Sequence, residues 1–263
     1  MTQVFSSRPR ARRAAGIVAT ALLAWLYADL GAWPLGFVVL VPWMSSSDDD
    51  ASLARTLLDA WAMAVAFTLA VFAWFGSAIG AFTQLGDAAG LAVLLIAAPL
   101  FQPQFLAFAL VRQVVGRRHG PALRALAAAS AWVATEALVP RLLGDTLGHG
   151  LWPSHVLRQA ADLGGATGLT LALLLANEGV AAAIARRLGG PRAIAWPLGL
   201  AAAIPLLLAG YGFATLPGET AAAGKPLKLG LVQSNIADYE RLRRERGTAA
   251  VVREVLDTHF AMS

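Results

Sequence analysis

The sequence predicts a mainly α-helical membrane protein, in which a polytopic bundle of about seven spans precedes an incomplete α/β segment. Three observations support this fold class. The 263 residues are 57% hydrophobic and 14% charged, whereas soluble globular proteins carry about a quarter charged residues. Arginines lie at the ends of long charge-free runs, and a strand-like stretch with an amphipathic helix comes only near the end of the chain. We therefore expect a transmembrane helical domain over residues 1–217 and a water-soluble segment over residues 218–263.

Charge-free apolar runs locate the spans, because a helix needs about 20 residues to cross the hydrocarbon core. The first two runs are short, and Trp33-Pro34 marks the turn between them. This pair is therefore either two spans or a kinked hairpin that does not fully cross. Both alternatives return the chain to the side where it began. The predicted spans are Ala14–Ala28, Leu35–Met44, Ala60–Gly86, Ala88–Val111, Ala125–Val139, Leu163–Ala185 and Ala193–Leu216.

The arginines predict the orientation of the bundle, because cytoplasmic loops carry an excess of Arg and Lys. If the N-terminus is cytoplasmic, the outer loops before residue 217 hold only Arg141 and Arg158. An odd number of spans then places everything after Leu216 outside, which is the periplasmic side of a bacterial inner membrane. The inner arginines are Arg8, Arg10, Arg12, Arg13, Arg55, Arg112, Arg117, Arg118, Arg124, Arg186, Arg187 and Arg192.

Charge and cysteine content exclude several classes of function. The net charge of +5 comes almost entirely from arginine, with lysine only at Lys225 and Lys228. Because the arginines flank apolar runs, they fit membrane orientation better than nucleic-acid binding, and we expect no nucleic-acid partner. The sequence contains no cysteine, so these residues form no disulfide, thiolate metal site or cysteine nucleophile. We expect neither a metal nor a cofactor.

Two residues of the stretch WVATE, Trp132 and Glu136, are candidate binding residues. They are four residues apart and therefore share one face of a helix. A carboxylate inside a membrane is costly and faces the bundle interior or water. One interpretation is a polar contact with a lipid head group or an anchor for a periplasmic domain. The other, which we favour, is a protonated or paired structural glutamate near the outer interface.

A second polar feature within the spans is the stretch APLFQPQF, from Ala98 to Phe105. Pro99 and Pro103 each remove a helix hydrogen bond, and Gln102 and Gln104 flank Pro103. This pattern is typical either of a broken helix that lines a polar cavity or of a kink whose freed carbonyls are satisfied by neighbours. We favour the kink.

The sixth span and the loop before it hold the remaining polar residues. Glu178 lies toward the cytoplasmic half of that span, and we expect it to pair with Arg186 or Arg187. Gly164, Gly165 and Gly168 are expected to let this helix pack closely on a neighbour. The loop from Pro140 to Asp162 holds His149, His155, Asp145 and Asp162. Their spacing matches no helical pair of metal ligands, so we favour a lid or surface loop.

The last part of the sequence predicts the start of a soluble α/β domain. Leu229–Val232 is typical of a short buried strand, and Asp238–Phe260 of an amphipathic helix. One strand and one helix cannot bury a core, so we expect the rest of that domain to be missing. The apolar stripe of the helix consists of Val251, Val252, Val255, Leu256 and Phe260.

These features together resemble the apolipoprotein N-acyltransferase family, bacterial inner-membrane enzymes that join a helical membrane domain to a periplasmic carbon–nitrogen hydrolase (nitrilase-like) domain. LGAWPLGFVVLVPW, from Leu30 to Trp43, is similar to the family's Gly-Trp-Pro-Leu start, and WVATE to its Trp-x-x-x-Glu helix. LRQAADLGGATGLTLALLLAN, from Leu157 to Asn177, resembles the entry to its sixth span. LGLVQSNI is like its first nitrilase strand, with Gln233 and Asn235 in the expected places.

The resemblance implies an acyltransferase with a Glu-Lys-Cys triad. In the family the cysteine thiolate takes an acyl chain from a phospholipid and passes it to the α-amine of the terminal cysteine of a diacylated apolipoprotein. The glutamate serves as general base, and the lysine stabilises the oxyanion. By the family's pattern these residues would follow Ser263, and Glu245 and Glu254 do not replace the glutamate. We therefore expect a C-terminally truncated chain that is inactive alone.

Two other classes of function compete with this interpretation. A chain without the hydrolase half would serve as a non-catalytic membrane scaffold or partner protein. A small transporter is disfavoured, because the spans show no inverted repeat and a transporter would not need the strand at Leu229.

Overall fold

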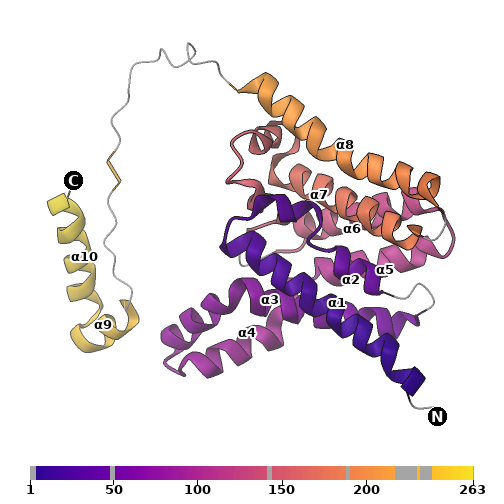
Figure 1. Ribbon diagram of the computed structural model, residues 1–263. Coiled ribbons are helices and arrows are strands. Elements are labelled where there is room, and N and C mark those ends of the chain that lie inside the picture. Colours follow the sequence, from indigo (N-terminus) through magenta and orange to yellow (C-terminus); the bar gives the residue numbers. More distant parts are fainter. Residues whose placement is uncertain are drawn as a thin grey trace.

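The computed structural model describes residues 4–47, 51–140, 144–187, 190–216, 230–231 and 239–262. Every regular element within these ranges is a helix, and helices α1 to α8 form one bundle (Figure 1). The elements of the bundle are α1 (Val4–Asp29), η1 (Trp33–Phe37), α2 (Val41–Ser46), α3 (Leu53–Thr83), α4 (Asp87–Phe101), α5 (Gln104–Gly116), α6 (Pro121–Leu138), η2 (Leu147–Leu151), η3 (Leu157–Ala160), α7 (Ala161–Ala185) and α8 (Pro191–Thr215).

Three helical stretches are long and apolar enough to cross a membrane, and a bent pair gives a fourth candidate span. They are α3, the stretch Leu157–Ala185 that contains α7, and α8, and the bent pair is α4 with α5. These four coincide with predicted spans. The predicted runs Ala14–Ala28 and Ala125–Val139 lie in helices α1 and α6, which do not pass the same test of length and composition. The chain is therefore a membrane-embedded helical bundle with three or four such spans among the described residues, and the predicted count of seven is not confirmed.

The second predicted span, Leu35–Met44, is a broken helical segment rather than one helix. Its two parts, η1 and α2, run back along α1 through the interior, where Val39 and Leu40 are fully buried. Asn177 of α7 accepts the N–H of Leu40 at 2.8 Å and donates to the carbonyl of Gly36 at 2.8 Å. Because side chains satisfy the backbone groups at the break, an irregular segment is tolerated inside the bundle. The second of the first two runs is therefore kinked, and its crossing of the membrane stays a prediction.

Aromatic side chains fill the centre of the bundle, between η1 and α2 on one side and α3, α5 and α6 on the other. Phe105 lies 4.7 Å from Trp132 and 5.1 Å from Phe67, measured between ring centroids. Trp43 contacts Phe105 edge-on at 5.6 Å. Lipid tails are as apolar as these rings, so the cluster stabilises the bundle through close packing rather than through removal from water.

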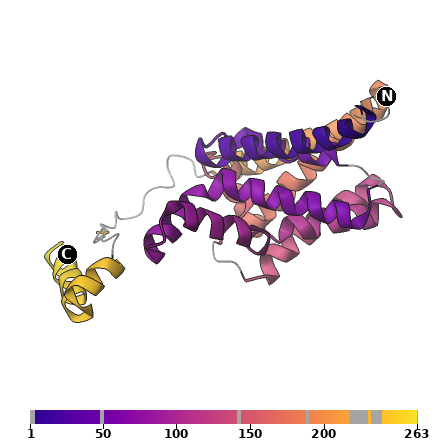
Figure 2. The same cartoon turned by 90° about the horizontal axis from the view of Figure 1, so that it is seen from below.

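Glycines allow several close contacts in the bundle, but not the glycines predicted to do so. A Cβ on Gly90 of α4 would lie 2.2 Å from the carbonyl oxygen of Gly76 of α3, and Figure 2 shows the two helices side by side. A Cβ on Gly212 of α8 would lie 2.0 Å from the carbonyl oxygen of Val156. By contrast, a Cβ on residues 164, 165 and 168 would meet nothing within 4 Å. The expected close packing at those three glycines is therefore wrong, and Gly165 instead provides a positive φ of 66° at a kink in α7.

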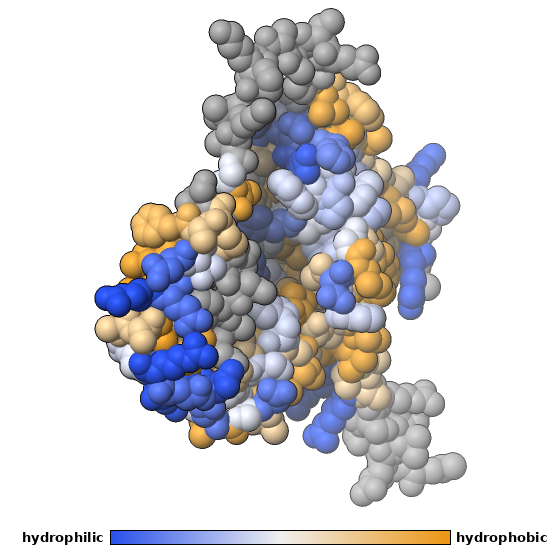
Figure 3. Space-filling model, turned by 90° about the vertical axis from the view of Figure 1, so that its left-hand side faces the viewer, coloured by the Kyte–Doolittle hydropathy of each residue, from blue (hydrophilic) through white to orange (hydrophobic). Residues whose placement is uncertain are grey.

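Apolar side chains also cover much of the outside of the bundle. On α8, Trp196 is 78% exposed and Phe213 is 71% exposed. On α4, Ile96 is 79% exposed. Hydrophobic side chains likewise reach the surface on the face shown in Figure 3. Such a surface suits lipid as the surrounding solvent.

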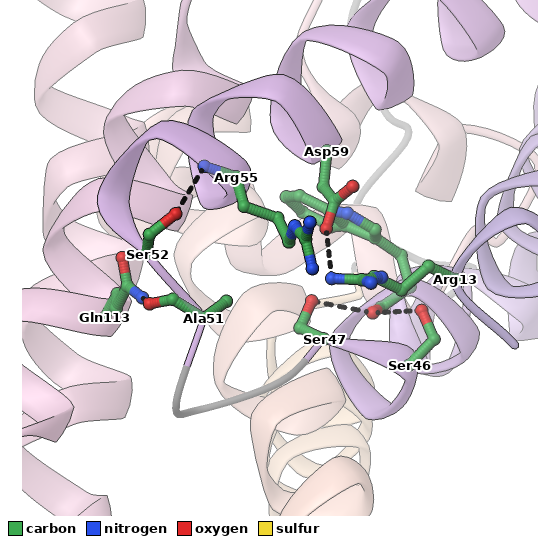
Figure 4. A network of polar contacts seen from close by, with 9 residues as sticks. Arg13, Ser46, Ser47, Ala51, Ser52, Arg55, Asp59 and Gln113 are labelled. Atoms are coloured by element: carbon green, nitrogen blue, oxygen red, sulfur yellow. Dashed lines mark hydrogen bonds and ion pairs between the residues drawn. The ribbon is translucent and has the colours of Figure 1, made fainter. Parts of the chain in front are cut away.

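A polar network ties the start of α3 to α1 and α5 (Figure 4). Arg13 of α1, which is 8% exposed, pairs with Asp59 of α3 at 3.6 Å. Ser52 caps α3 by accepting the N–H of Arg55. Gln113 of α5 donates to the carbonyl of Ala51, just before α3. We call this end of the molecule the α5–α6 end, because the turn between those helices lies there, and the opposite end the η2 end.

The C-terminal segment differs from its prediction where it is described. The predicted helix Asp238–Phe260 is two helices, α9 (Tyr239–Arg246) and α10 (Thr248–Met262), separated at Gly247. Gly247 has a φ of 82°, which a continuous α-helix does not allow. Most of the predicted strand, together with Gln233 and Asn235, lies outside the described residues, and Gly230 and Leu231 form no strand. The α/β segment is therefore not confirmed.

Candidate functional site

A cavity of about 340 Å³ lies toward the η2 end of the bundle. Its walls come from the end of α1, the middle of α3, the junction of α4 and α5, the end of α6 and η2. Apolar and polar side chains share the lining, so the cavity suits a molecule that carries both characters. The lining residues are Ala24, Tyr27, Ala28, Asp29, Phe67, Val71, Phe72, Trp74, Gln102, Gln104, Trp132, Glu136, Asp145, Thr146, Leu147, His149 and Gly150.

Helix α6 contributes Trp132 and Glu136 to this cavity. The indole Nε1 of Trp132 donates to Glu136 Oε1 at 2.9 Å, one helical turn away. Both residues are buried, at 2% and 6% exposure. Edge-on contacts with Phe105 and Phe108 hold the indole in place. The carboxylate is therefore held in a fixed position at the cavity wall.

The junction of α4 and α5 contributes an amide pair. The two helices meet at an angle of 41°, and α5 begins directly after Pro103. Gln104 donates to the side-chain oxygen of Gln102, and both residues are buried and line the cavity. Proline breaks the helix here because it supplies no N–H. This stretch is thus a broken helix whose two glutamines line the cavity, and the simple kink favoured from the sequence is wrong.

The η2 segment forms one wall of the cavity and is anchored on both sides. Tyr27 Oη donates to the carbonyl of Leu147 at 2.7 Å, and the N–H of Gly148 donates to Thr170 Oγ1 at 2.8 Å. A Cβ on Gly150 would lie 2.1 Å from the ring of Tyr27, so the segment packs directly on α1. This part of the predicted surface loop is therefore a buried wall of the bundle.

Five titratable residues line the cavity: Tyr27, Asp29, Glu136, Asp145 and His149. The imidazole Nδ1 of His149 accepts the N–H of Thr146 at 2.9 Å, so the neutral ring carries its proton on Nε2. Over the described ranges, no three His, Asp or Glu side chains come together as a metal site would need.

Glu178 lies outside this cavity, toward the α5–α6 end. The prediction that it pairs with Arg186 or Arg187 is wrong. Its carboxylate accepts from Arg112 Nε of α5 at 2.6 Å and lies 3.8 Å from Arg124 Nη2 of α6. The Glu178 side chain is 1% exposed. Two arginines from other helices reach the carboxylate inside the bundle, which the local pairing with Arg186 or Arg187 did not anticipate.

Of the four candidate residues predicted from the sequence, the structure brings Trp132 and Glu136 together, while Gln233 and Asn235 lie outside the described residues. Sequence reasoning missed the contribution of Tyr27. Gly36 and Gly150 both pack on the Tyr27 ring, and a larger residue at either position would clash with it. The sequence contains these glycines, but only the fold shows that they contact Tyr27.

Comparison with known families identifies the family of the chain and covers the cavity. The profile of the apolipoprotein N-acyltransferase N-terminal domain matches residues 19–178, from α1 to Glu178 of α7. Searches among curated proteins and solved structures found no match. The matched range includes every residue that lines the cavity. Since the match covers more than half of the chain, the chain belongs to the apolipoprotein N-acyltransferase family through its N-terminal domain.

Proposed function

We propose that this chain is the membrane part of an enzyme that moves an acyl chain from a phospholipid to the N-terminal cysteine amine of diacylated apolipoproteins. The observation that carries the proposal is the cavity, which joins the Trp132–Glu136 pair to an apolar wall within the range matched by the family. Membership of the family supports lipid and lipoprotein substrates in a membrane.

The two kinds of lining suit the two parts of a lipid substrate. Phe67, Val71 and Phe72 of α3 provide apolar contacts for acyl methylenes. Gln102, Gln104 and the Trp132–Glu136 pair provide hydrogen-bonding groups at the polar wall. An ester or head-group oxygen can accept from the amide N–H groups, which fixes how deep the chain enters. In this proposal Trp132 and Glu136 bind and position substrate.

The covalent step of the proposed reaction needs a cysteine, which these 263 residues do not contain. In the proposed reaction a cysteine thiolate attacks the acyl ester, the lysophospholipid leaves, and the resulting thioester is opened by the amine of the acceptor. The sequence contains no cysteine, so none of its residues can form that thioester. Purified protein of these 263 residues should transfer no acyl chain from phosphatidylethanolamine to a diacylated lipopeptide.

We place the chain in the inner membrane with its N-terminus in the cytoplasm. In that orientation the η2 end and the cavity lie toward the periplasm, where acceptor lipoproteins reside. Residues 218–263 would begin a periplasmic nitrilase-like domain, with Gln233 and Asn235 in its first strand and loop. Alkaline phosphatase fused after Gly224 should be active, and an inactive fusion that is stably expressed would contradict this orientation.

A chimera tests the proposed function. Residues 1–217 would replace the corresponding membrane helices of a complete apolipoprotein N-acyltransferase, and N-acylation of a diacylated lipopeptide would be measured by mass spectrometry. We expect transfer by the chimera, and a loss of about tenfold for Glu136→Gln, because a hydrogen bond to a charged group contributes about 1.5–3 kcal/mol. Asp87→Asn, at the exposed start of α4, is the control and should leave the rate unchanged. A stable chimera whose rate is indifferent to Glu136→Gln would refute the binding role.

A non-catalytic scaffold remains the second candidate, favoured by the absence of cysteine from the sequence. The same chimera separates the two ideas. A scaffold would be inserted into the membrane and would hold the periplasmic domain there, yet give no transfer although the parent enzyme is active under the same conditions.

A further inference from the structure

A second hollow lies beside η2, separate from the cavity described above. It is a groove of about 270 Å³ between η2, the segment around Trp152 and the first turns of α7. Its lining combines apolar residues with two basic ones and no carboxylate: Gly148, His149, Trp152, Arg158, Gln159, Ala161, Ala166 and Leu169. His149 lines both the groove and the cavity.

Arg158 is held at this groove with part of its hydrogen-bonding capacity unused. Its guanidinium lies 4.4 Å from the centre of the Trp152 ring. Nη1 donates to the carbonyl of Trp152 at 3.2 Å, and Nη2 contacts His155 Nδ1 at 2.9 Å. A guanidinium has five N–H donors, so these bonds leave three without a partner in the described part of the chain. The side chain is thus oriented in advance for an anionic group.

The setting of this arginine points to the interface of a membrane. Trp152 is 71% exposed, although a large aromatic ring is costly to leave in water. Tryptophan is enriched at the head-group level of bilayers, and arginine beside it reaches the lipid phosphates. Leu169 and Ala166 of α7 continue the groove with apolar surface, as an acyl chain below a phosphate would require.

We propose that this groove binds a phospholipid of the surrounding bilayer, with the lipid phosphate at Arg158. His149 provides a second donor, because its Nδ1 accepts the N–H of Thr146 and its Nε2 therefore carries a proton. Trp152 orients the guanidinium, and the lipid glycerol and chains run along α7. Binding in this groove does not require acyl transfer, so it can be tested on the 263-residue chain, which we expect to have no transfer activity.

Lipid binding to the purified, delipidated 263-residue chain tests the proposal by native mass spectrometry. The probe is dioleoylphosphatidylglycerol, whose head group brings no cationic amine of its own. Arg158→Gln should weaken binding about tenfold, since charge-assisted hydrogen bonds contribute about 1.5–3 kcal/mol. Arg192→Gln, an exposed arginine at the start of α8, is the matched control and should bind as the wild type does.

Dioleoylglycerol, which has the same chains and no phosphate, should bind the wild type and Arg158→Gln equally. Trp152→Leu gives a second variant at an exposed position and should weaken phosphatidylglycerol binding about threefold through loss of the cation–π contact. The proposal fails if Arg158→Gln binds phosphatidylglycerol as the wild type does. It fails equally if Arg158→Gln and Arg192→Gln weaken phosphatidylglycerol binding to the same extent, or if Arg158→Gln also weakens dioleoylglycerol binding.

Discussion

The two ends of the bundle hold buried carboxylates in different ways. At the α5–α6 end, Glu178 is packed between Arg112 and Arg124, with its side chain 1% exposed. At the η2 end, Glu136 accepts from the neutral indole of Trp132 and lines a cavity of about 340 Å³. Both are glutamates in apolar helices, yet only the second borders a space that a substrate can enter.

The difference shows how a bundle can separate stability from binding. A buried carboxylate needs charge neutralisation or hydrogen bonds, because transfer of an ion out of water is costly. Two arginines from neighbouring helices neutralise Glu178, and the cluster joins α5, α6 and α7. At the η2 end the broken α4–α5 junction and the anchored η2 wall leave open volume instead. We therefore expect substitutions to lower stability most at the α5–α6 end.

The largest effect is expected for Glu178→Gln. This variant keeps the shape of the side chain and removes the negative charge that faces Arg112 and Arg124, whose side chains are 12% and 15% exposed. Removing one partner of a buried ion pair costs about 3–5 kcal/mol. The free energy of unfolding, measured by denaturant titration in detergent micelles, should fall by about 3 kcal/mol, the lower limit, because both arginines retain some contact with solvent.

Glu254→Gln is the matched control for that prediction. Glu254 pairs with Arg246 at 2.9 Å, but both side chains are about half exposed. An exposed pair contributes about 0–1 kcal/mol, so the control should change stability by less than 1 kcal/mol. Equal losses for the two variants would show that the α5–α6 end is not a specific charge cluster.

The same comparison shows what the sequence could reveal. The apolar runs corresponding to α3, α4 with α5, α7 and α8 were visible, because charge-free stretches of that length have few uses outside a membrane. The shared face of Trp132 and Glu136 followed from helical spacing alone. The partners of Glu178 did not, because Arg112 and Arg124 lie on other helices and only packing brings them near.

The break at Pro103 illustrates the same limit at the cavity. The sequence showed two prolines with a glutamine on each side of Pro103, and this pattern fits both a kink, which the sequence favoured, and a cavity lining. The outcome depends on whether neighbouring elements fill the space beside the two glutamines. Here α3 and η2 border that space without filling it, and no pattern in the sequence predicted that they lie near Pro103.

An intermediate effect is expected at the η2 wall for Gly148→Ala. A Cβ at this position would lie 2.1 Å from the carbonyl oxygen of Ala166, so η2 or α7 must move. Overpacking costs about 1–3 kcal/mol, and the shift would also disturb the bond from Gly148 N–H to Thr170. Thermal unfolding in detergent should show the loss. Gly144→Ala, where a Cβ meets nothing within 4 Å, should be neutral, and equal destabilisation by both would mean that η2 is not seated on α7.

The smallest effect on stability is expected for Trp132→Phe at the cavity. The phenyl ring keeps the aromatic contact with Phe105 but removes the N–H that donates to Glu136. Loss of a hydrogen bond to a charged group costs about 1.5–3 kcal/mol, and we expect the lower end, about 1.5 kcal/mol, because the aromatic packing is kept; this is about half the effect of Glu178→Gln. Without the indole N–H the Glu136 carboxylate should also be held less firmly, so in the chimera the rate of acyl transfer should fall more than stability does. A loss of stability as large as that of Glu178→Gln would mean that Trp132 and Glu136 serve mainly to hold the bundle together, and the contrast between its two ends would disappear.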